Sequence, residues 1–190
     1  MVTKRNAGYE KKQARATLEK GLLIVITGTG KGKTTSALGM AVRAIAHGMK
    51  LGVVQFIKGA KATGERDVFA RFPNVDWHTI GDGFTWITQD REKDIETAGK
   101  AWHQAQQLIG DPGYQMVILD ELNTILRYGY IDVLNVLQTL SARDPMQHVI
   151  ITGRHAPDAL IQAADLVSDI HPVKHPYKDQ GVKAQRGIEF

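Results

Sequence analysis

The stretch Thr27-Gly28-Thr29-Gly30-Lys31-Gly32-Lys33-Thr34-Thr35 decides the fold of this chain. It follows an apolar run at residues 22–26 and precedes a helix-compatible run at residues 36–42. A strand, a glycine-rich loop and a helix in this order are typical of a phosphate-binding loop. The glycines let successive backbone N–H groups turn toward phosphate oxygens, and the helix N-terminus adds partial positive charge. The stretch therefore predicts a site for the phosphate chain of a nucleotide.

The side chains of this loop have separate predicted roles. Lys33 would reach the phosphates and act as a catalytic cation, and the hydroxyl of Thr34 would bind a magnesium ion. The usual pattern has a glycine at the position of Thr27, so this loop begins at Gly28 and is one residue shorter. The alternative is a glycine-rich turn that holds no ligand. The candidate ATP-binding residues of the loop are Gly28, Thr29, Gly30, Lys31, Gly32, Lys33, Thr34 and Thr35.

An acid pair follows a second apolar run. Residues 115–119 lead into Asp120 and Glu121, and a carboxylate at the end of a strand can hold magnesium directly or through water. Both acids are therefore candidate metal ligands beside Thr34. Glu121 is also a candidate catalytic residue, because the second acid positions water in many hydrolases; a helix-capping role for Asp120 is the alternative. Together the motifs predict ATP or GTP with Mg²⁺, without saying how the nucleotide is used.

Composition limits the classes of protein to consider. The chain has 190 residues and no cysteine, which excludes disulfides, cysteine nucleophiles and thiolate metal sites. No window approaches the roughly 18 apolar residues of a membrane span. The first residues are polar and rich in lysine, unlike a secretory signal. We therefore expect a cytoplasmic protein without a membrane partner.

The positive charge is concentrated in residues 1–20. The chain has a formal net charge of +4, and this segment holds six basic and two acidic side chains, so the remainder is balanced. We expect a basic N-terminal arm at residues 1–20, which could form a lid helix, and a single domain at residues 21–190. The arm could contact nucleic acid, fold over an anionic ligand or remain a solvated tail.

Predicted strands and helices alternate along the chain, which favours an α/β fold with a mainly parallel sheet and helices on both faces. Arg154, at the end of the fifth predicted strand, is a further candidate for contact with the nucleotide. Residues 175–190 lack periodicity and are expected to be irregular. The predicted strands cover residues 22–27, 51–57, 75–80, 115–121, 148–154 and 166–173. The predicted helices cover residues 33–47, 65–72, 91–109, 122–128, 133–142 and 157–164.

Several motifs in sequence order resemble the bacterial ATP:corrinoid adenosyltransferases. One is the phosphate loop, whose shortened form is a mark of that family, and another is Gly83-Phe84-Thr85-Trp86. The resemblance implies a P-loop NTPase (RecA-like) architecture. It also implies transfer of the 5′-deoxyadenosyl group of ATP to the reduced cobalt of a corrinoid, with release of triphosphate. The remaining matching motifs are residues 52–59, 119–122, 149–154, 172–175 and 181–188.

The resemblance also implies roles that the residue pattern alone does not give. ATP, the co-substrate, lies reversed in this family, so that C5′ faces the cobalt, which is itself the nucleophile. Phe84 and Trp86 occupy the lower face of the corrinoid and displace its lower ligand; simple closure of the core beneath a loop is the alternative. The resemblance further implies adenosylcobalamin biosynthesis or corrinoid salvage, a homodimer, a lid role for the arm, and an external reductant such as a flavodoxin-type protein.

Two other functions fit the phosphate loop. A small-molecule kinase would need an arginine-rich lid around the phosphates, and none is evident in the sequence. A nucleic-acid-dependent ATPase would use the basic arm, and its affinity for nucleic acid would fall steeply with salt. The adenosyltransferase interpretation expects no nucleic-acid partner.

Overall fold

A single parallel sheet organises the described part of the chain. The computed structural model describes residues 17–57, 64–80 and 91–189. Six strands lie in the order β3-β2-β4-β5-β1-β6, and every described pair is parallel, which confirms the predicted α/β fold. The strands are β1 (Leu23–Thr27), β2 (Leu51–Gln55), β3 (Val75–Thr79), β4 (Met116–Asp120), β5 (His148–Thr152) and β6 (Leu166–Asp169).

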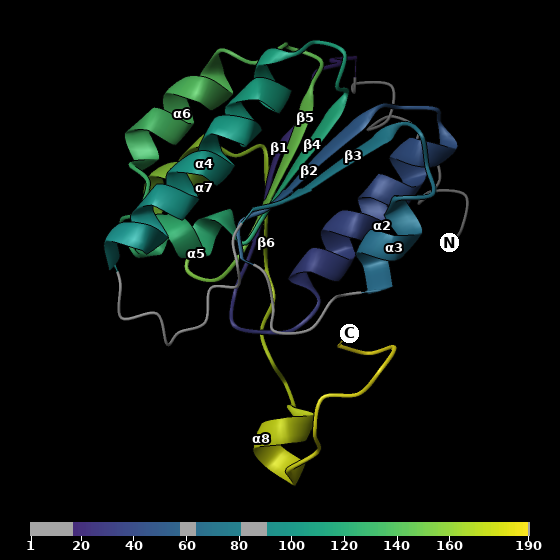
Figure 1. Ribbon diagram of the computed structural model, residues 1–190, viewed down its shortest axis with the longest axis vertical. Coiled ribbons are helices and arrows are strands. Elements are labelled where there is room, and N and C mark those ends of the chain that lie inside the picture. The colour runs from purple at the N-terminus through teal and green to yellow at the C-terminus, as the bar shows by residue number, and fades with distance from the viewer. Residues whose placement is uncertain (1–16, 58–63, 81–90, 190) are drawn as a thin grey trace, which may run out of the picture.

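Helices cover both faces of the sheet (Figure 1). Helices α2 (Lys33–Ala46) and α3 (Gly64–Phe69) lie on one face. On the other face lie α4 (Arg91–Gly110), α5 (Leu122–Arg127), α6 (Val133–Ser141) and α7 (Asp158–Ala163). No described helix is long and apolar enough to cross a bilayer.

Two hydrophobic cores explain why the central strands are apolar at nearly every position. In β1, Leu23 and Val25 pack toward α4–α7, whereas Ile24 and Ile26 pack toward α2 and α3. All four side chains are at most 5% exposed. Alternate residues of a strand point to opposite faces, so a strand covered on both sides needs a continuous apolar run.

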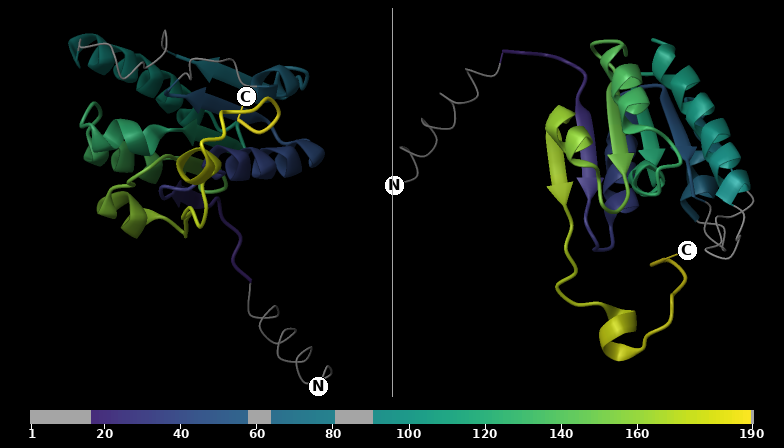
Figure 2. Two further views of the ribbon diagram at one scale, coloured as in Figure 1. Left: turned by 90° about the horizontal axis from the view of Figure 1, so that it is seen from below. Right: turned by 90° about the vertical axis from the view of Figure 1, so that its left-hand side faces the viewer.

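The C-terminal region departs from the prediction in two places. The sixth strand ends at Asp169 and does not continue to residue 173, because the chain leaves the sheet there and Pro172 cannot donate to a strand ladder. Residues expected to be irregular form α8 (Pro176–Gln180), which lies away from the sheet (Figure 2). Proline at the first turn and Gly181 at φ 66° are the local start and stop signals of this short helix.

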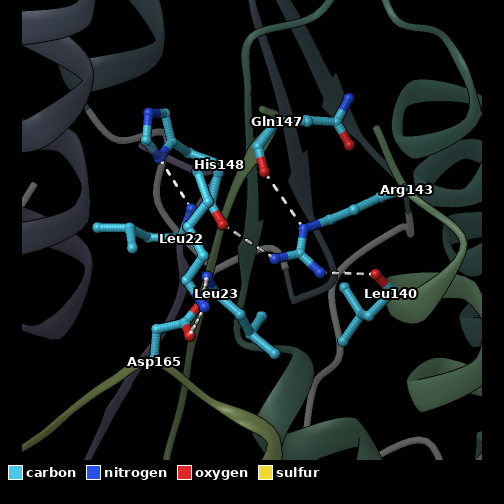
Figure 3. A network of polar contacts seen from close by, with 9 residues as sticks. Leu22, Leu23, Leu140, Arg143, Gln147, His148 and Asp165 are labelled. Carbon is cyan, nitrogen blue, oxygen red and sulfur yellow. Dashed lines mark hydrogen bonds and ion pairs between the residues drawn. The ribbon is translucent and has the colours of Figure 1, made fainter. Parts of the chain in front are cut away.

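Hydrogen bonds and an ion pair connect residues near the amino ends of β1 and β5 (Figure 3). The Arg143 guanidinium donates to the carbonyls of Leu140 at 2.7 Å and Gly21 at 3.2 Å. The Leu22 N–H donates to Nδ1 of His148 at 3.1 Å, so this ring nitrogen must be unprotonated. Lys20, beside β1, forms an ion pair with Asp165. Residues 1–16 of the basic arm lie outside the described residues, so the division into arm and domain stays a prediction.

We predict that this network makes folding stability sensitive to pH. Burial lowers the pKa of His148 below its ordinary value of 6.5, and the positive charge of Arg143 lowers it further. The unfolded chain therefore binds a proton more readily than the folded chain, and stability is lost as the pH falls below 6.5. Urea unfolding between pH 7.5 and 5.5 measures this loss. His148→Gln keeps an acceptor that does not titrate and should flatten the profile, whereas parallel profiles for both proteins would contradict the assignment.

Candidate active site

The phosphate loop, the acid pair and Arg154 lie at or just beyond the ends of strands at the carboxyl edge of the sheet, the lower edge in Figure 1. The glycine-rich loop follows β1, the acid pair stands at the end of β4, and Arg154 lies two residues beyond β5. In open parallel sheets this edge is the usual place for a ligand. Strand order brings the pieces together, because β5 alone separates β1 from β4.

The phosphate loop has a conformation that requires glycine at two positions. Gly28 and Gly32 have φ of 98° and 106°, in the region that side chains disfavour. A Cβ at Gly28 would also lie 2.3 Å from the carbonyl oxygen of Ile170. The N–H of Gly30 donates to this same carbonyl at 2.7 Å. The loop therefore packs against Ile170, the residue that directly follows β6.

Lys33 is held against this loop. It begins α2 and is 6% exposed, and its ammonium group donates to the carbonyl of Gly30 at 2.7 Å. Burial lowers the pKa of Lys33, while the nearby charge of Glu121 raises it in part. The loop thus carries a desolvated cation, which interacts strongly with any anion that enters.

The structure places Thr34 beside the acid pair. Its Oγ1 donates to Oδ1 of Asp120 at 2.8 Å, although the two residues are 86 positions apart in the sequence. Two of the three predicted metal ligands are therefore in direct contact. The carboxylate of Asp120 is 4% exposed, and burial raises its pKa.

Neutral donors surround the Asp120 carboxylate. Besides Thr34, the hydroxyl of Thr152 donates to Oδ1 at 2.7 Å, and Nε2 of Gln55 lies 3.4 Å from Oδ2. A buried carboxylate with neutral partners is an environment that a cation would complete. The oxygen donors of Thr34 and Asp120 are of the kind that Mg²⁺ prefers.

Glu121 turns the chain from β4 into α5. Its φ of 64° lies in the left-handed region, which is uncommon for a residue with a side chain. The backbone N–H of Glu121 donates to Oγ1 of Thr152 at 3.0 Å, and its Oε2 accepts from Oγ1 of Thr124 at 2.6 Å. Backbone and carboxylate are thus both fixed next to Asp120.

A magnesium site here would be completed by the nucleotide. Among the described residues, no group of three or more His, Cys, Asp or Glu side chains is arranged to hold a metal ion. Mg²⁺ commonly binds one or two carboxylates together with substrate phosphates and water. The residues present therefore fit a metal that arrives with ATP.

The other predicted residues are less closely joined to this centre. Arg154 is exposed, and its positive charge contributes to lowering the pKa of Lys33. Lys31 points to the C-terminal segment, where its ammonium group lies 3.1 Å from Oε2 of Glu189. Thr29 and Thr35 are exposed. Phe84 and Trp86 lie outside the described residues.

Sequence reasoning missed Thr152 and Gln55. Both are polar residues at the carboxyl end of a strand, Gln55 ending β2 and Thr152 ending β5. The sequence signal that could have identified them is a polar residue at the end of an apolar strand. Because β-branched threonine also favours strands, the pattern alone does not separate this role from an ordinary strand position.

The fold and the site define a P-loop nucleotide-binding protein of the α/β class. The chain belongs to the ATP:corrinoid adenosyltransferase BtuR/CobO/CobP family, whose family model matches residues 19–190. The resemblance found from sequence motifs is thereby confirmed, and the chain is an enzyme of the transferase class.

Similar proteins support this assignment over nearly the whole chain. The corrinoid adenosyltransferase of Pseudomonas aeruginosa is 52% identical over 190 residues, covering 100% of this chain and 93% of that protein. The corrinoid adenosyltransferase of Escherichia coli (strain K12) is 46% identical over 177 residues, covering 93% of this chain and 89% of that protein. Flagellar accessory protein FlaH from Methanocaldococcus jannaschii is similar in fold alone, with a TM-score of 0.52, 12% identity, and coverage of 84% and 75%.

Proposed function

We propose that the chain transfers the 5′-deoxyadenosyl group of ATP to the reduced cobalt of a corrinoid substrate and releases triphosphate. The observation that carries the proposal is the family match over residues 19–190, and the contact between Thr34 and Asp120 supports it. This contact joins a phosphate loop to a carboxylate at one sheet edge. The product is used in adenosylcobalamin synthesis or corrinoid salvage.

The protein does not need to form a covalent bond with a substrate in this reaction. The electron pair of the reduced cobalt attacks C5′ of ATP, a cobalt–carbon bond forms, and the bond from C5′ to the triphosphate oxygen breaks. The pair from cobalt forms the new bond, and the triphosphate leaves with the electron pair of the broken C5′–O bond. The chain supplies orientation and charge stabilisation, which are the two large contributions available without a protein nucleophile.

Lys33 and the loop N–H groups would stabilise the negative charge on the leaving triphosphate. Lys33 is already desolvated beside Gly30, so its charge needs little reorganisation as the bond breaks. Magnesium held by Thr34, Asp120 and Glu121 would neutralise further charge on the triphosphate. The partners of the Glu121 backbone and carboxylate, Thr152 and Thr124, would hold this residue in place beside the metal.

Product analysis separates this function from the two other interpretations. A kinase would transfer the terminal phosphoryl group to an acceptor, and an ATPase would release inorganic phosphate, faster with nucleic acid. The transferase should release triphosphate, and only when reduced corrinoid is present. Release of inorganic phosphate without corrinoid would contradict the proposal.

The corrinoid side of the site carries a separate prediction. By resemblance, Phe84 and Trp86 displace the lower ligand of cob(II)alamin and so make reduction of the cobalt easier. Phe84→Ala and Trp86→Ala should therefore keep the affinity for ATP but lose adenosylation that starts from cob(II)alamin, measured as cobalt–carbon bond formation. Phe72→Ala, at a partly exposed aromatic residue just beyond α3, serves as the control. Full activity in both alanine variants would refute the assignment.

Three further features belong to the same proposal and rest on the resemblance. The protein acts in the cytoplasm as a homodimer. An external reductant such as a flavodoxin-type protein supplies the electron for cob(II). The basic arm at residues 1–20 closes over the corrinoid as a lid.

A further inference from the structure

One hydroxyl group links both members of the acid pair. Thr152 is 0% exposed, and its Oγ1 donates to Oδ1 of Asp120 at 2.7 Å while accepting from the N–H of Glu121 at 3.0 Å. Its hydrogen-bonding capacity is thus directed to the two adjacent acids. No described partner of this hydroxyl lies outside the candidate active site.

The contact with Glu121 stands where a strand ladder would otherwise continue. The paired register of β4 and β5 runs from Met116↔His148 to Leu119↔Ile151 and ends one residue before Asp120 and Thr152. Beyond it, the Glu121 N–H bonds to a side chain and not to a backbone carbonyl. The Thr152 hydroxyl therefore accepts the hydrogen bond of Glu121, the residue at which the backbone adopts a φ of 64°.

Thr152 also decides which oxygen of Asp120 has spare capacity. Thr34 and Thr152 both donate to Oδ1, whereas among the described residues Oδ2 accepts only from Nε2 of Gln55, at 3.4 Å. A carboxylate oxygen can accept about two hydrogen bonds. Oδ2 is thus the oxygen of Asp120 that keeps capacity for a further ligand.

We propose that Thr152 is a positioning residue that fixes the Asp120 carboxylate and the Glu121 backbone for binding of magnesium with ATP. The inference rests on the proposed function. Residues that orient metal ligands typically change metal affinity about 10- to 100-fold when they are mutated. A valine at this position would keep the shape and burial but remove both hydrogen bonds.

The test compares ATP dissociation constants measured by calorimetry with Mg²⁺ and with EDTA. The wild-type chain should bind ATP more tightly with Mg²⁺. In Thr152→Val, the enhancement of ATP affinity by Mg²⁺ should be about 10- to 100-fold smaller than in the wild type. The ATP affinity measured in EDTA should be unchanged. Thr152→Ser restores the hydroxyl and should restore most of the enhancement.

Thr139→Val is the matched control. Thr139 on α6 also has a hydroxyl with two partners, donating to the Asn135 carbonyl at 3.1 Å and accepting from Gln106 at 3.3 Å, away from the acid pair. An unchanged Mg²⁺ enhancement in Thr152→Val would overturn the inference. So would equal losses with Mg²⁺ and EDTA, or a similar effect of Thr139→Val, because these indicate a general structural role. A wild-type chain without Mg²⁺ enhancement would instead refute the magnesium assignment itself, and this inference with it.

Discussion

Replacing Lys33 with methionine should lower kcat/KM for adenosyl transfer about 100- to 1,000-fold, the loss typical when a preorganised charge partner is removed. Lys33 is 6% exposed and its ammonium group donates to the Gly30 carbonyl, so the charge is already held in place against the loop. The readout is triphosphate release with chemically reduced corrinoid and Mg²⁺. Because burial penalises the charged form of this lysine, methionine should leave the free energy of unfolding nearly unchanged.

Lys31 provides the comparison within the same loop. Its side chain is 50% exposed and pairs with Glu189. An exposed ion pair contributes little, so Lys31→Met should lower kcat/KM far less than Lys33→Met. Equal losses in the two variants would show that the loop acts through overall positive charge. Full activity in Lys33→Met would refute its catalytic role.

Asp120→Asn should reduce kcat/KM about 100-fold or more, because a bound metal contributes several kcal/mol of charge stabilisation. The amide keeps the shape of the carboxylate but lacks its charge, so the Mg²⁺ concentration needed for half-maximal rate should rise. Stability should not fall with activity, since burial already disfavours the ionised aspartate. If the Asp120→Asn variant were more stable than the wild type but inactive, the charge of Asp120 would be needed for function and not for stability.

The measurement is a magnesium titration of the initial transfer rate, accompanied by urea unfolding. Asp158→Asn is the control, because Asp158 lies exposed in the first turn of α7. It should change neither the rate nor the magnesium requirement. If Asp120→Asn kept the wild-type magnesium requirement, the metal assignment would be wrong.

The sequence located the phosphate loop and the acid pair because each is a local pattern. The loop is a strand, glycines and a helix, and the pair ends an apolar run. What local patterns cannot give is strand order, because periodicity does not say which strands are neighbours. The contact between Thr34 and Asp120 depends on β5 lying between β1 and β4.

Other parts of the site were beyond sequence reasoning for different physical reasons. Thr152 ends an apolar strand, and its hydroxyl gains a role only through its neighbours on β4. The C-terminal segment has no hydrophobic periodicity, so the proline and glycine that bound α8 did not by themselves predict a helix, and the pairing of Glu189 with Lys31 had no local signal. The roles of Phe84 and Trp86 came from resemblance to a family and not from their spacing.

In the proposed reaction, the phosphate loop holds triphosphate as a leaving group. The most direct test incubates the protein with Mg-ATP and chemically reduced cobalamin under strict anaerobic conditions. The visible spectrum reports the cobalt–carbon bond, and triphosphate is quantified in the same sample. We predict equal amounts of the cobalt–carbon bond and triphosphate. No spectral change, or release of inorganic phosphate in place of triphosphate, would contradict the proposed reaction.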